Sequence, residues 1–162
     1  MQRRKRMPGH ERRRQLLEVS AGLFAERGYW DTGTNEIARA AGISEPTIYR
    51  HFSGKEELFL AASLEALEGL LSTFDEADIR SLADLRSWLA VQAAQGPALA
   101  ILGRLLQEGR RPSFRSEACR LLGGLQARLE GRLGAAEARE GREAVLAAAL
   151  LASAGLMTPA VV

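Results

Sequence analysis

Apolar residues recur every three or four positions along most of the chain, which is the spacing of one face of an α-helix. This spacing predicts a first helix over residues 11–27, ended by Gly28, because glycine readily adopts the left-handed conformation that follows a helix. The inner stripe of this helix consists of Leu16, Val19, Ser20, Leu23 and Phe24. No alternating strand pattern of useful length occurs. The pattern therefore predicts an all-α fold.

A tight turn joins two short predicted helices within residues 32–55. The inner face of the first of these helices consists of Ile37, Ala38 and Ala41. Gly42 supplies a left-handed residue at the turn. Ser44 is expected to cap the second helix, and Pro46 falls in its first turn, where a missing N–H costs nothing.

The second short helix has an inner and an outer side. Ile48 and Phe52 are expected to face back onto Ala38, whose small side chain lets the two helices cross closely. The residues left outside are Glu45, Thr47, Tyr49, Arg50 and His51. Exposed hydroxyl, cationic and aromatic groups on a short second helix suit insertion into a DNA major groove. The segment is thus predicted to be a helix-turn-helix.

Further helices are predicted after this unit. Ser53 and Glu56 have the spacing of a capping box, so a helix is expected from about residue 55 to residue 74. Four more helices are expected over residues 81–95, 98–109, 114–134 and 139–157. The last of them is apolar nearly all round and must bury two faces, for which a partner subunit is the simplest solution.

Charge is distributed unevenly along the chain. Residues 1–56 contain 11 Lys and Arg against 7 Asp and Glu, whereas residues 57–162 contain 11 against 13. A basic front end supports contact with nucleic acid. We divide the chain into a disordered basic arm (1–10), a helix-turn-helix DNA-binding domain (11–56) and a helical ligand-binding and dimerisation domain (57–162). The arm is either a frayed terminus or a segment that follows phosphates or enters the minor groove.

Other residue types argue against an enzyme or a membrane protein. The two histidines, His10 and His51, do not form a metal-ligand pattern with cysteine or carboxylate residues, and no nucleophile motif occurs, so no cofactor is expected. Cys119 is the only cysteine, which agrees with a reducing cytoplasm, and it is expected to be a small core residue. The longest apolar run, residues 144–157, is too short to span a bilayer.

A small-molecule cavity is predicted in the C-terminal half, which has many apolar positions but few large ones. The candidate ligand-binding residues are Trp88, Gln92, Ile101, Leu105, Phe114 and Leu122. Sparse polar groups in an apolar lining are typical of small-molecule sites, with Gln92 or Gln95 as the polar anchor. The alternative for each apolar member is an ordinary place in a filled core.

Four sequence blocks resemble the DNA-binding domain of the TetR family of bacterial transcriptional regulators. They are LFAERGYW (23–30), IARAAGIS (37–44), TIYRHF (47–52) and KEEL (55–58). The resemblance covers about residues 11–58 and implies base contacts by Glu45, Pro46 and Thr47. It also implies phosphate contacts by Tyr49, His51 and Lys55.

One position departs from the family pattern. Gly33 stands where the family has a capping Ser or Thr that also binds a phosphate, so Thr32, Thr34 or Asn35 is expected to take that phosphate. The complete set of predicted DNA-contacting residues is Thr34, Asn35, Ser44, Glu45, Pro46, Thr47, Tyr49, Arg50, His51 and Lys55.

The resemblance also implies partners and a mode of action. Similar proteins usually dimerise through their last two helices, which predicts a homodimer on a palindromic operator. The predicted function is a cytoplasmic repressor that a small lipophilic ligand releases from double-stranded DNA. The alternative is a ligand-independent DNA-binding or nucleoid-associated helical module.

Overall fold

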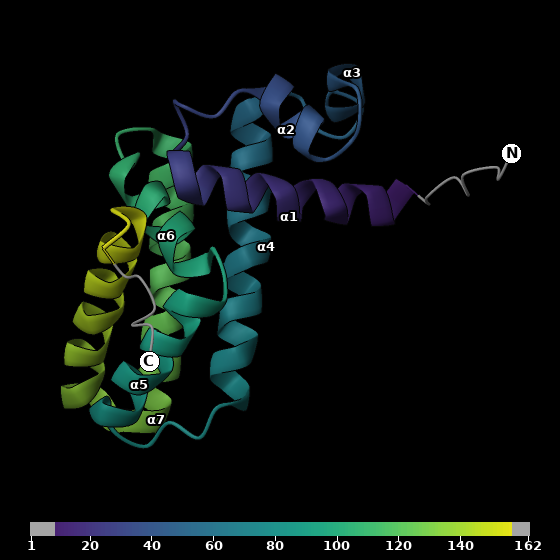
Figure 1. Cartoon of the computed structure of the whole chain (residues 1–162). Helices are drawn as coiled ribbons and strands as arrows, with labels where there is room; N and C mark the ends of the chain where they lie inside the picture. Colours follow the sequence, from purple (N-terminus) through teal and green to yellow (C-terminus); the bar gives the residue numbers. More distant parts are fainter. Residues whose placement is uncertain (1–8, 157–162) are drawn as a thin grey trace, which may run out of the picture.

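A computed structural model describes residues 9–156, which contain seven helices and no strand (Figure 1). The helices are α1 (Gly9–Arg27), α2 (Thr34–Ala40), α3 (Glu45–Ile48), α4 (Lys55–Glu76), α5 (Leu82–Gln95), α6 (Ala98–Gln107) and α7 (Pro112–Ser153). The predicted all-α class is confirmed. The predicted basic arm lies mostly outside the described residues, and α1 begins at Gly9, two residues before the predicted start.

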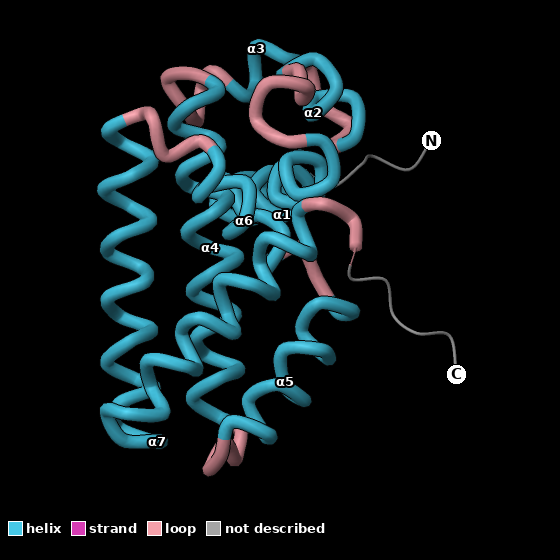
Figure 2. Tube along the Cα trace, turned by 90° about the vertical axis from the view of Figure 1, so that its left-hand side faces the viewer, coloured by secondary structure: helices cyan, strands magenta, loops and turns pink. Residues whose placement is uncertain are grey.

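The first three helices form a compact unit at one end of the molecule, and α4 runs from this unit along the helical body (Figures 1 and 2). One aromatic cluster joins the two parts. The Phe59 ring of α4 lies 5.0 Å from Phe24, 5.3 Å from Tyr29 and 4.9 Å from Phe114, measured between ring centroids. The predicted division after residue 56 therefore cuts the first turn of α4, and the core is continuous across it.

Helix α7 is divided at Gly134, whose φ of 78° and ψ of 166° are not helical. The chain reverses there, so that residues 112–133 (the first arm) and 135–153 (the second arm) lie side by side (Figure 1). The break after residue 134 agrees with the prediction of two helices, but the second arm begins immediately after Gly134 and not at residue 139. The predicted end of that helix, residue 157, lies outside the described residues.

Helix α6 packs against the second arm almost backbone to backbone at Gly103. A Cβ atom at this position would lie 2.2 Å from the carbonyl oxygen of Ala149 and 2.7 Å from the Cβ of Ser153. One turn further along α6, the Gln107 amide donates a 3.0 Å hydrogen bond to the Ser153 hydroxyl. The absence of a side chain at Gly103 is what permits this close approach.

Two local predictions are corrected by the structure. Ser53 does not pair with Glu56: its backbone N–H and hydroxyl both donate to the Glu57 carboxylate, at 2.7 and 2.6 Å. The reason is that Gly54 is the N-cap, which makes Glu57 the third residue of α4. Cys119 is exposed on the first arm and is not a core residue.

One further finding concerns membranes. Within residues 9–156, no single helix is long and apolar enough to cross a bilayer. Only α5 and α6 taken together meet that test, and a 92° bend separates them.

Candidate DNA-binding surface and ligand cavity

The helix-turn-helix is assembled as its apolar pattern predicts. Ile48 and Phe52 are buried, with 0% and 2% of their surface exposed, and they pack in the same core as Ala38. Gly42 has a φ of 65°, and the Ile43 N–H after it donates to the Ala38 carbonyl at 3.0 Å. This turn fixes α3 against α2 and leaves the opposite side of α3 to solvent.

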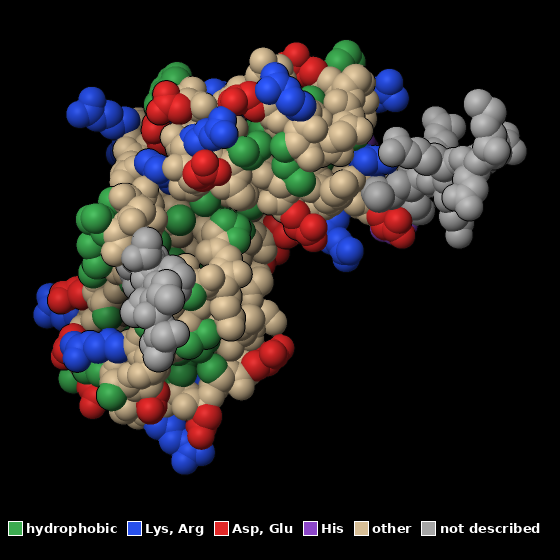
Figure 3. Space-filling model, viewed as in Figure 1, with side chains coloured by type: hydrophobic (Ala, Val, Ile, Leu, Met, Phe, Trp, Pro, Cys, Tyr) green, Lys and Arg blue, Asp and Glu red, His purple; other side chains and the backbone are tan. Residues whose placement is uncertain are grey.

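The outer side of α3 and the turn after it carries the predicted DNA contacts. Tyr49 is 51% exposed, Pro46 and Arg50 are also exposed, and Thr47 and His51 are partly exposed. Figure 3 shows Lys and Arg side chains at intervals over this end of the molecule, interspersed with Asp and Glu. On the face shown in Figure 3, the cationic groups are separate points and not a continuous basic band.

Several of these polar groups are already paired with one another. The Thr34 hydroxyl donates to the Glu45 carboxylate and lies 3.3 Å from the Tyr49 hydroxyl. Ser44 occupies the N-cap of α3, but its hydroxyl lies 2.9 Å from that of Thr47 and does not cap the backbone. The expected side-chain cap by Ser44 is therefore wrong. A base amine that approaches Glu45 must compete with Thr34 for the carboxylate.

The start of α2 explains the departure at Gly33. A Cβ on Gly33 would lie 2.4 Å from Oδ1 of Asn35, so glycine makes room for this amide oxygen, which accepts from the Glu36 N–H at 2.8 Å. The Gly33 N–H donates to the Glu36 carboxylate, and this bond, with the Arg27 guanidinium, lowers the pKa of Glu36. Thr32 is buried, whereas Asn35 is exposed at the start of α2. Of the three residues expected to take the phosphate, Thr32 is therefore the one that is withdrawn from solvent.

Lys55 is directed into the protein by the loop after α1. Its ammonium donates to the Tyr29 carbonyl at 2.9 Å and to the Thr32 carbonyl at 3.2 Å, and it lies 4.5 Å from the centroid of the Tyr29 ring. Two of its three N–H groups are therefore used to hold this loop. Only one remains for the predicted phosphate contact.

A polar clasp, which the sequence did not reveal, connects α4 to the start of α7. Arg111 donates to the Glu56 carboxylate at 2.8 Å, and Ser113 donates to its other oxygen at 2.6 Å. The Arg111 guanidinium also lies 4.8 Å from the Trp30 ring and 5.0 Å from the Tyr29 ring. The clasp therefore fixes the loop after α1, α4 and α7 relative to one another.

Helix α6 grips the end of α1 in a similar way. Arg104 donates from Nε to the Ala25 carbonyl at 3.2 Å and from Nη2 to the Glu26 carbonyl at 3.0 Å. These are two of the carbonyls at the C-terminal end of α1, where a helix leaves its acceptors unpaired and favours a cation. These two hydrogen bonds join α6 to the end of α1.

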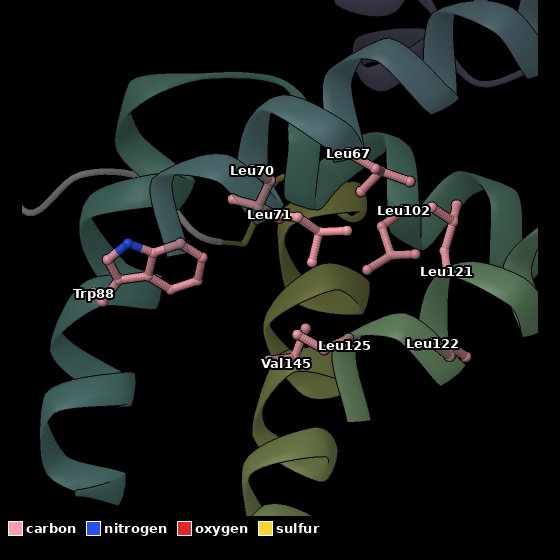
Figure 4. Close-up of a pocket in the computed structure, with 9 residues that line it drawn as sticks. All are labelled: Leu67, Leu70, Leu71, Trp88, Leu102, Leu121, Leu122, Leu125 and Val145. Carbon is pink, nitrogen blue, oxygen red and sulfur yellow. The ribbon is translucent and has the colours of Figure 1, made fainter. Parts of the chain in front are cut away.

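A small apolar cavity of about 30 Å³ lies between α4, α5, α6 and both arms of α7 (Figure 4). Its lining consists of Leu67, Leu70, Leu71, Trp88, Leu102, Leu121, Leu122, Leu125 and Val145. No titratable side chain is among these residues. The interior therefore suits hydrocarbon.

Two of the six predicted ligand-binding residues, Trp88 and Leu122, line this cavity. Ile101 and Leu105 are fully buried elsewhere in the core, and Phe114 belongs to the aromatic cluster. Gln92 lies outside the lining, with its amide oxygen 3.5 Å from the Thr73 hydroxyl. These four residues therefore lie outside the lining of this cavity.

Comparison with known proteins identifies the N-terminal unit. Residues 16–62 match the family model described as "Bacterial regulatory proteins, tetR family". The N-terminal unit of this chain is thus similar to the DNA-binding domain of TetR-family regulators. The match includes the second half of α1, the whole helix-turn-helix and the first two turns of α4.

Two curated transcriptional regulators match different lengths of this chain. The HTH-type transcriptional activator FasR of Mycolicibacterium smegmatis is 43% identical over 90 residues, which cover 54% of this chain and 41% of FasR. The HTH-type transcriptional repressor KstR2 of Mycobacterium tuberculosis is 47% identical over 49 residues, which cover 30% of this chain and 24% of KstR2. The matches thus span less than half of these relatives.

The likeness in fold extends over nearly the whole chain. The crystal structure of the multidrug binding protein EbrR, complexed with malachite green, superimposes with a TM-score of 0.64 and 21% identity. It covers 90% of this chain and 96% of EbrR. At this identity the likeness establishes the architecture of the helical body. No group of three metal-ligating side chains occurs in the part of the chain that the structure describes.

Proposed function

We propose that this protein is a transcriptional repressor that binds a palindromic DNA operator as a homodimer and is released by a small lipophilic ligand. The observation that carries the proposal is the position of α3, which buries Ile48 while Tyr49 and Arg50 remain exposed beside it. An outward-facing helix of this kind reads base edges in the major groove, and the cationic groups around it fix its register on the phosphates. The protein acts in the cytoplasm.

The dimer is proposed to form through the two arms of α7. Leu150 and Leu151 on the second arm are 46% and 45% exposed. Large aliphatic side chains in adjacent exposed positions mark an interaction surface, and a two-fold contact is the commonest solution for identical chains. The two copies of α3 must then lie one helical turn of DNA apart, about 34–36 Å.

Ligand release is proposed to act through α4. The cavity touches α4 at its middle, and the first turn of α4 carries Lys55 and Glu56, which hold the loop after α1 and the start of α7. A ligand that fits only one position of α4 changes the spacing of the two reading helices. It can shift DNA binding only by its difference in affinity for the two states.

The regulatory sign follows from this release mechanism. Release from DNA by an effector suits a repressor, and the relative KstR2 is named a transcriptional repressor. FasR is named an activator, so both signs occur among the related proteins.

The test is footprinting of the DNA upstream of the gene with increasing amounts of competitor DNA. We expect protection of one palindromic site that survives the competitor. Uniform coating that the competitor removes would contradict the proposal and favour the nucleoid-type module. Sedimentation of the free protein at the same concentrations reports whether the dimer exists before DNA is added.

A further inference from the structure

The start of α7 carries a serine with arginines on both sides. Arg110 and Arg111 stand three and two positions before Ser113, and Arg115 stands two positions after it. No other serine or threonine in the sequence has an arginine or lysine at both the third and the second position before it. Protein kinases select their substrates in part by the pattern of charge around the acceptor, and basophilic serine kinases read arginines at these two positions. The sequence around Ser113 is therefore that of a kinase substrate.

The segment that leads to Ser113 is accessible. Residues 108–111 connect α6 to α7 and lie outside both helices. Arg110 and Pro112 are exposed, and the backbone of Arg111 is extended, with a φ of −81° and a ψ of 127°. Ser113 is the second residue of α7 and is partly exposed. Because the first N–H groups of a helix have no partner within it, presenting this turn to an enzyme breaks few hydrogen bonds.

The Ser113 hydroxyl is one of the two donors that hold Glu56 in the clasp. Ser113 donates to Oε1 of Glu56 at 2.6 Å, and Arg111 donates to Oε2 at 2.8 Å. The side chains of Glu56 and Arg111 are 44% and 33% exposed, so the clasp lies at the surface. Glu56 follows Lys55, which holds the loop after α1. The clasp therefore attaches the DNA-binding unit to the start of α7.

We propose that Ser113 is a phosphorylation site for an arginine-reading serine kinase and that the phosphate opens the clasp. In this reaction the Ser113 Oγ forms a bond to the γ-phosphorus of ATP, the bond from that phosphorus to the β–γ bridging oxygen breaks, and ADP leaves. The hydroxyl proton passes to the kinase or to water. The product carries about 1.5–2 negative charges at neutral pH.

Phosphorylation reverses the electrostatics of the clasp. The Ser113 Oγ loses its proton and can no longer donate to Glu56, and the phosphate oxygens repel the carboxylate that now lies 2.6 Å from it. Arg111 then has two anions to choose from. The phosphate has more charge and more acceptor oxygens, so the guanidinium is expected to leave Glu56 for the phosphate. Both hydrogen bonds from the start of α7 to Glu56 are then lost.

The opened clasp is expected to weaken operator binding. Loss of the two hydrogen bonds releases the first turn of α4 from α7, and this turn also holds the loop after α1 through Lys55. The DNA-binding unit is then less firmly fixed on the helical body. This consequence rests on the proposed function, whereas the modification and the opening of the clasp do not depend on DNA.

The modification is tested on the full chain with magnesium, ATP and the catalytic subunit of cAMP-dependent protein kinase, which reads this arginine pattern. Tandem mass spectrometry locates the product, and we expect phosphate on Ser113. Arg110→Gln removes one of the two arginines that the kinase reads and leaves the clasp residues in place, so it is expected to slow the modification. A chain that stays unmodified, or that is modified only at other residues, would overturn the proposal.

Trp30 reports the state of the clasp. The Arg111 guanidinium lies 4.8 Å from the Trp30 ring, and the ring N–H donates to Glu108 at 3.0 Å. In a Trp88→Phe chain Trp30 is the only tryptophan. Phosphorylation is expected to change its fluorescence and to lower the melting temperature by about 2–4 °C, as the loss of a partly exposed polar contact does in a chain of this size. No change in either reading would refute the opening of the clasp.

Two aspartate variants separate the position of the charge from its presence. Ser113→Asp places a carboxylate opposite Glu56, and Ser116→Asp adds the same charge at an exposed position three residues further along α7. Operator affinity is expected to fall about fivefold or more for Ser113→Asp, the lower end of ordinary coupling between sites, and to change little for Ser116→Asp. Equal losses for the two variants would contradict the proposal.

Glu56→Gln supplies the decisive background, because it removes the carboxylate that the phosphate is expected to repel. In this background Ser113→Asp should cause no further loss of melting temperature. The same loss in both backgrounds would show that repulsion of Glu56 is not the mechanism, and the proposal would fail.

Readings with and without DNA separate this inference from the proposed function. If the operator is protected but Ser113 is not modified, this inference alone fails. If Ser113 is modified and the clasp opens but no operator is protected, the proposed function fails and the modification site stands. If the operator is protected with equal affinity before and after phosphorylation, the regulatory part of this inference is wrong.

Discussion

The close approach at Gly103 gives a sharp test of how α6 is seated on α7. In Gly103→Ala the new Cβ would lie 2.2 Å from the Ala149 carbonyl oxygen, whereas ordinary contact begins at 3.4 Å. The obstacle is helix backbone, which cannot rotate aside as a side chain can. Helix α6 must therefore move away by about 1 Å, the difference between these two distances.

The magnitude follows from two opposing effects. Overpacking of this kind costs about 1–3 kcal/mol, and backbone contacts belong at the upper end. Replacing glycine by alanine inside a helix returns about 0.5–1 kcal/mol. We expect Gly103→Ala to lose about 2 kcal/mol of unfolding free energy, which corresponds to a fall of about 4–8 °C in melting temperature for a chain of this size.

Gly22→Ala is the matched control. Gly22 lies inside α1, and a Cβ there would have no neighbour within 4 Å. The same chemical change is therefore expected to raise the melting temperature by about 2–4 °C. Thermal unfolding followed by far-UV circular dichroism, at equal protein concentrations, measures both variants. If Gly103→Ala is as stable as the wild type, or if the two variants shift together, the described packing of α6 is incorrect.

Three further predictions concern the DNA-binding unit. Thr47→Ala should cost about 1–3 kcal/mol at the operator and little on random DNA, by anisotropy titration of both duplexes; equal losses would contradict a base contact. Lys55→Met should lower the melting temperature, because the Tyr29 carbonyl loses its donor. It should also reduce the salt dependence of DNA binding by about one ion. An unchanged melting temperature would contradict the structural role of Lys55, and an unchanged salt dependence would contradict its phosphate contact. The hydroxyl and N–H of Ser53 hold the pKa of Glu57 below its ordinary value of 4.5. The ionised Glu57 carboxylate therefore stabilises the fold above pH 4.5, and this stabilisation is lost as the pH falls through the lowered pKa. Glu57→Gln should flatten this acid dependence in unfolding experiments, and an unchanged pH profile would refute it.

Local signals explain why much of the fold could be predicted from the sequence. The buried positions of the helix-turn-helix, such as Ile48 and Phe52, follow from helical spacing and from the turn glycine. The order of the later helices follows from glycine and proline breaks, with Gly134 as the sharpest case. These signals depend on only a few neighbouring residues, so they can be interpreted without knowledge of the tertiary structure.

What could not be predicted depends on partners distant in sequence. Arg111 and Glu56 are 55 positions apart, and neither position carries a local sign of the other. The cavity shows the same limit: Ile101 and Leu102 are adjacent in a helix buried nearly all round, and periodicity cannot tell which of them borders a void. The choice between Trp88 and Phe114 as a lining residue likewise depends on where α5 and α7 lie.

The cluster of Phe24, Tyr29, Phe59 and Phe114 has a consequence for engineering. Its rings come from both halves of the chain, so neither half can denature while the other keeps a complete interior, and heating should give one cooperative melting event. A chimaera that exchanges the DNA-reading end of such a protein must therefore carry along the opening turns of α4 and the facing turn of α7. A cut at residue 56 would separate Phe24 and Tyr29 from Phe59 and Phe114, and each fragment would lack the aromatic rings that its own rings pack against.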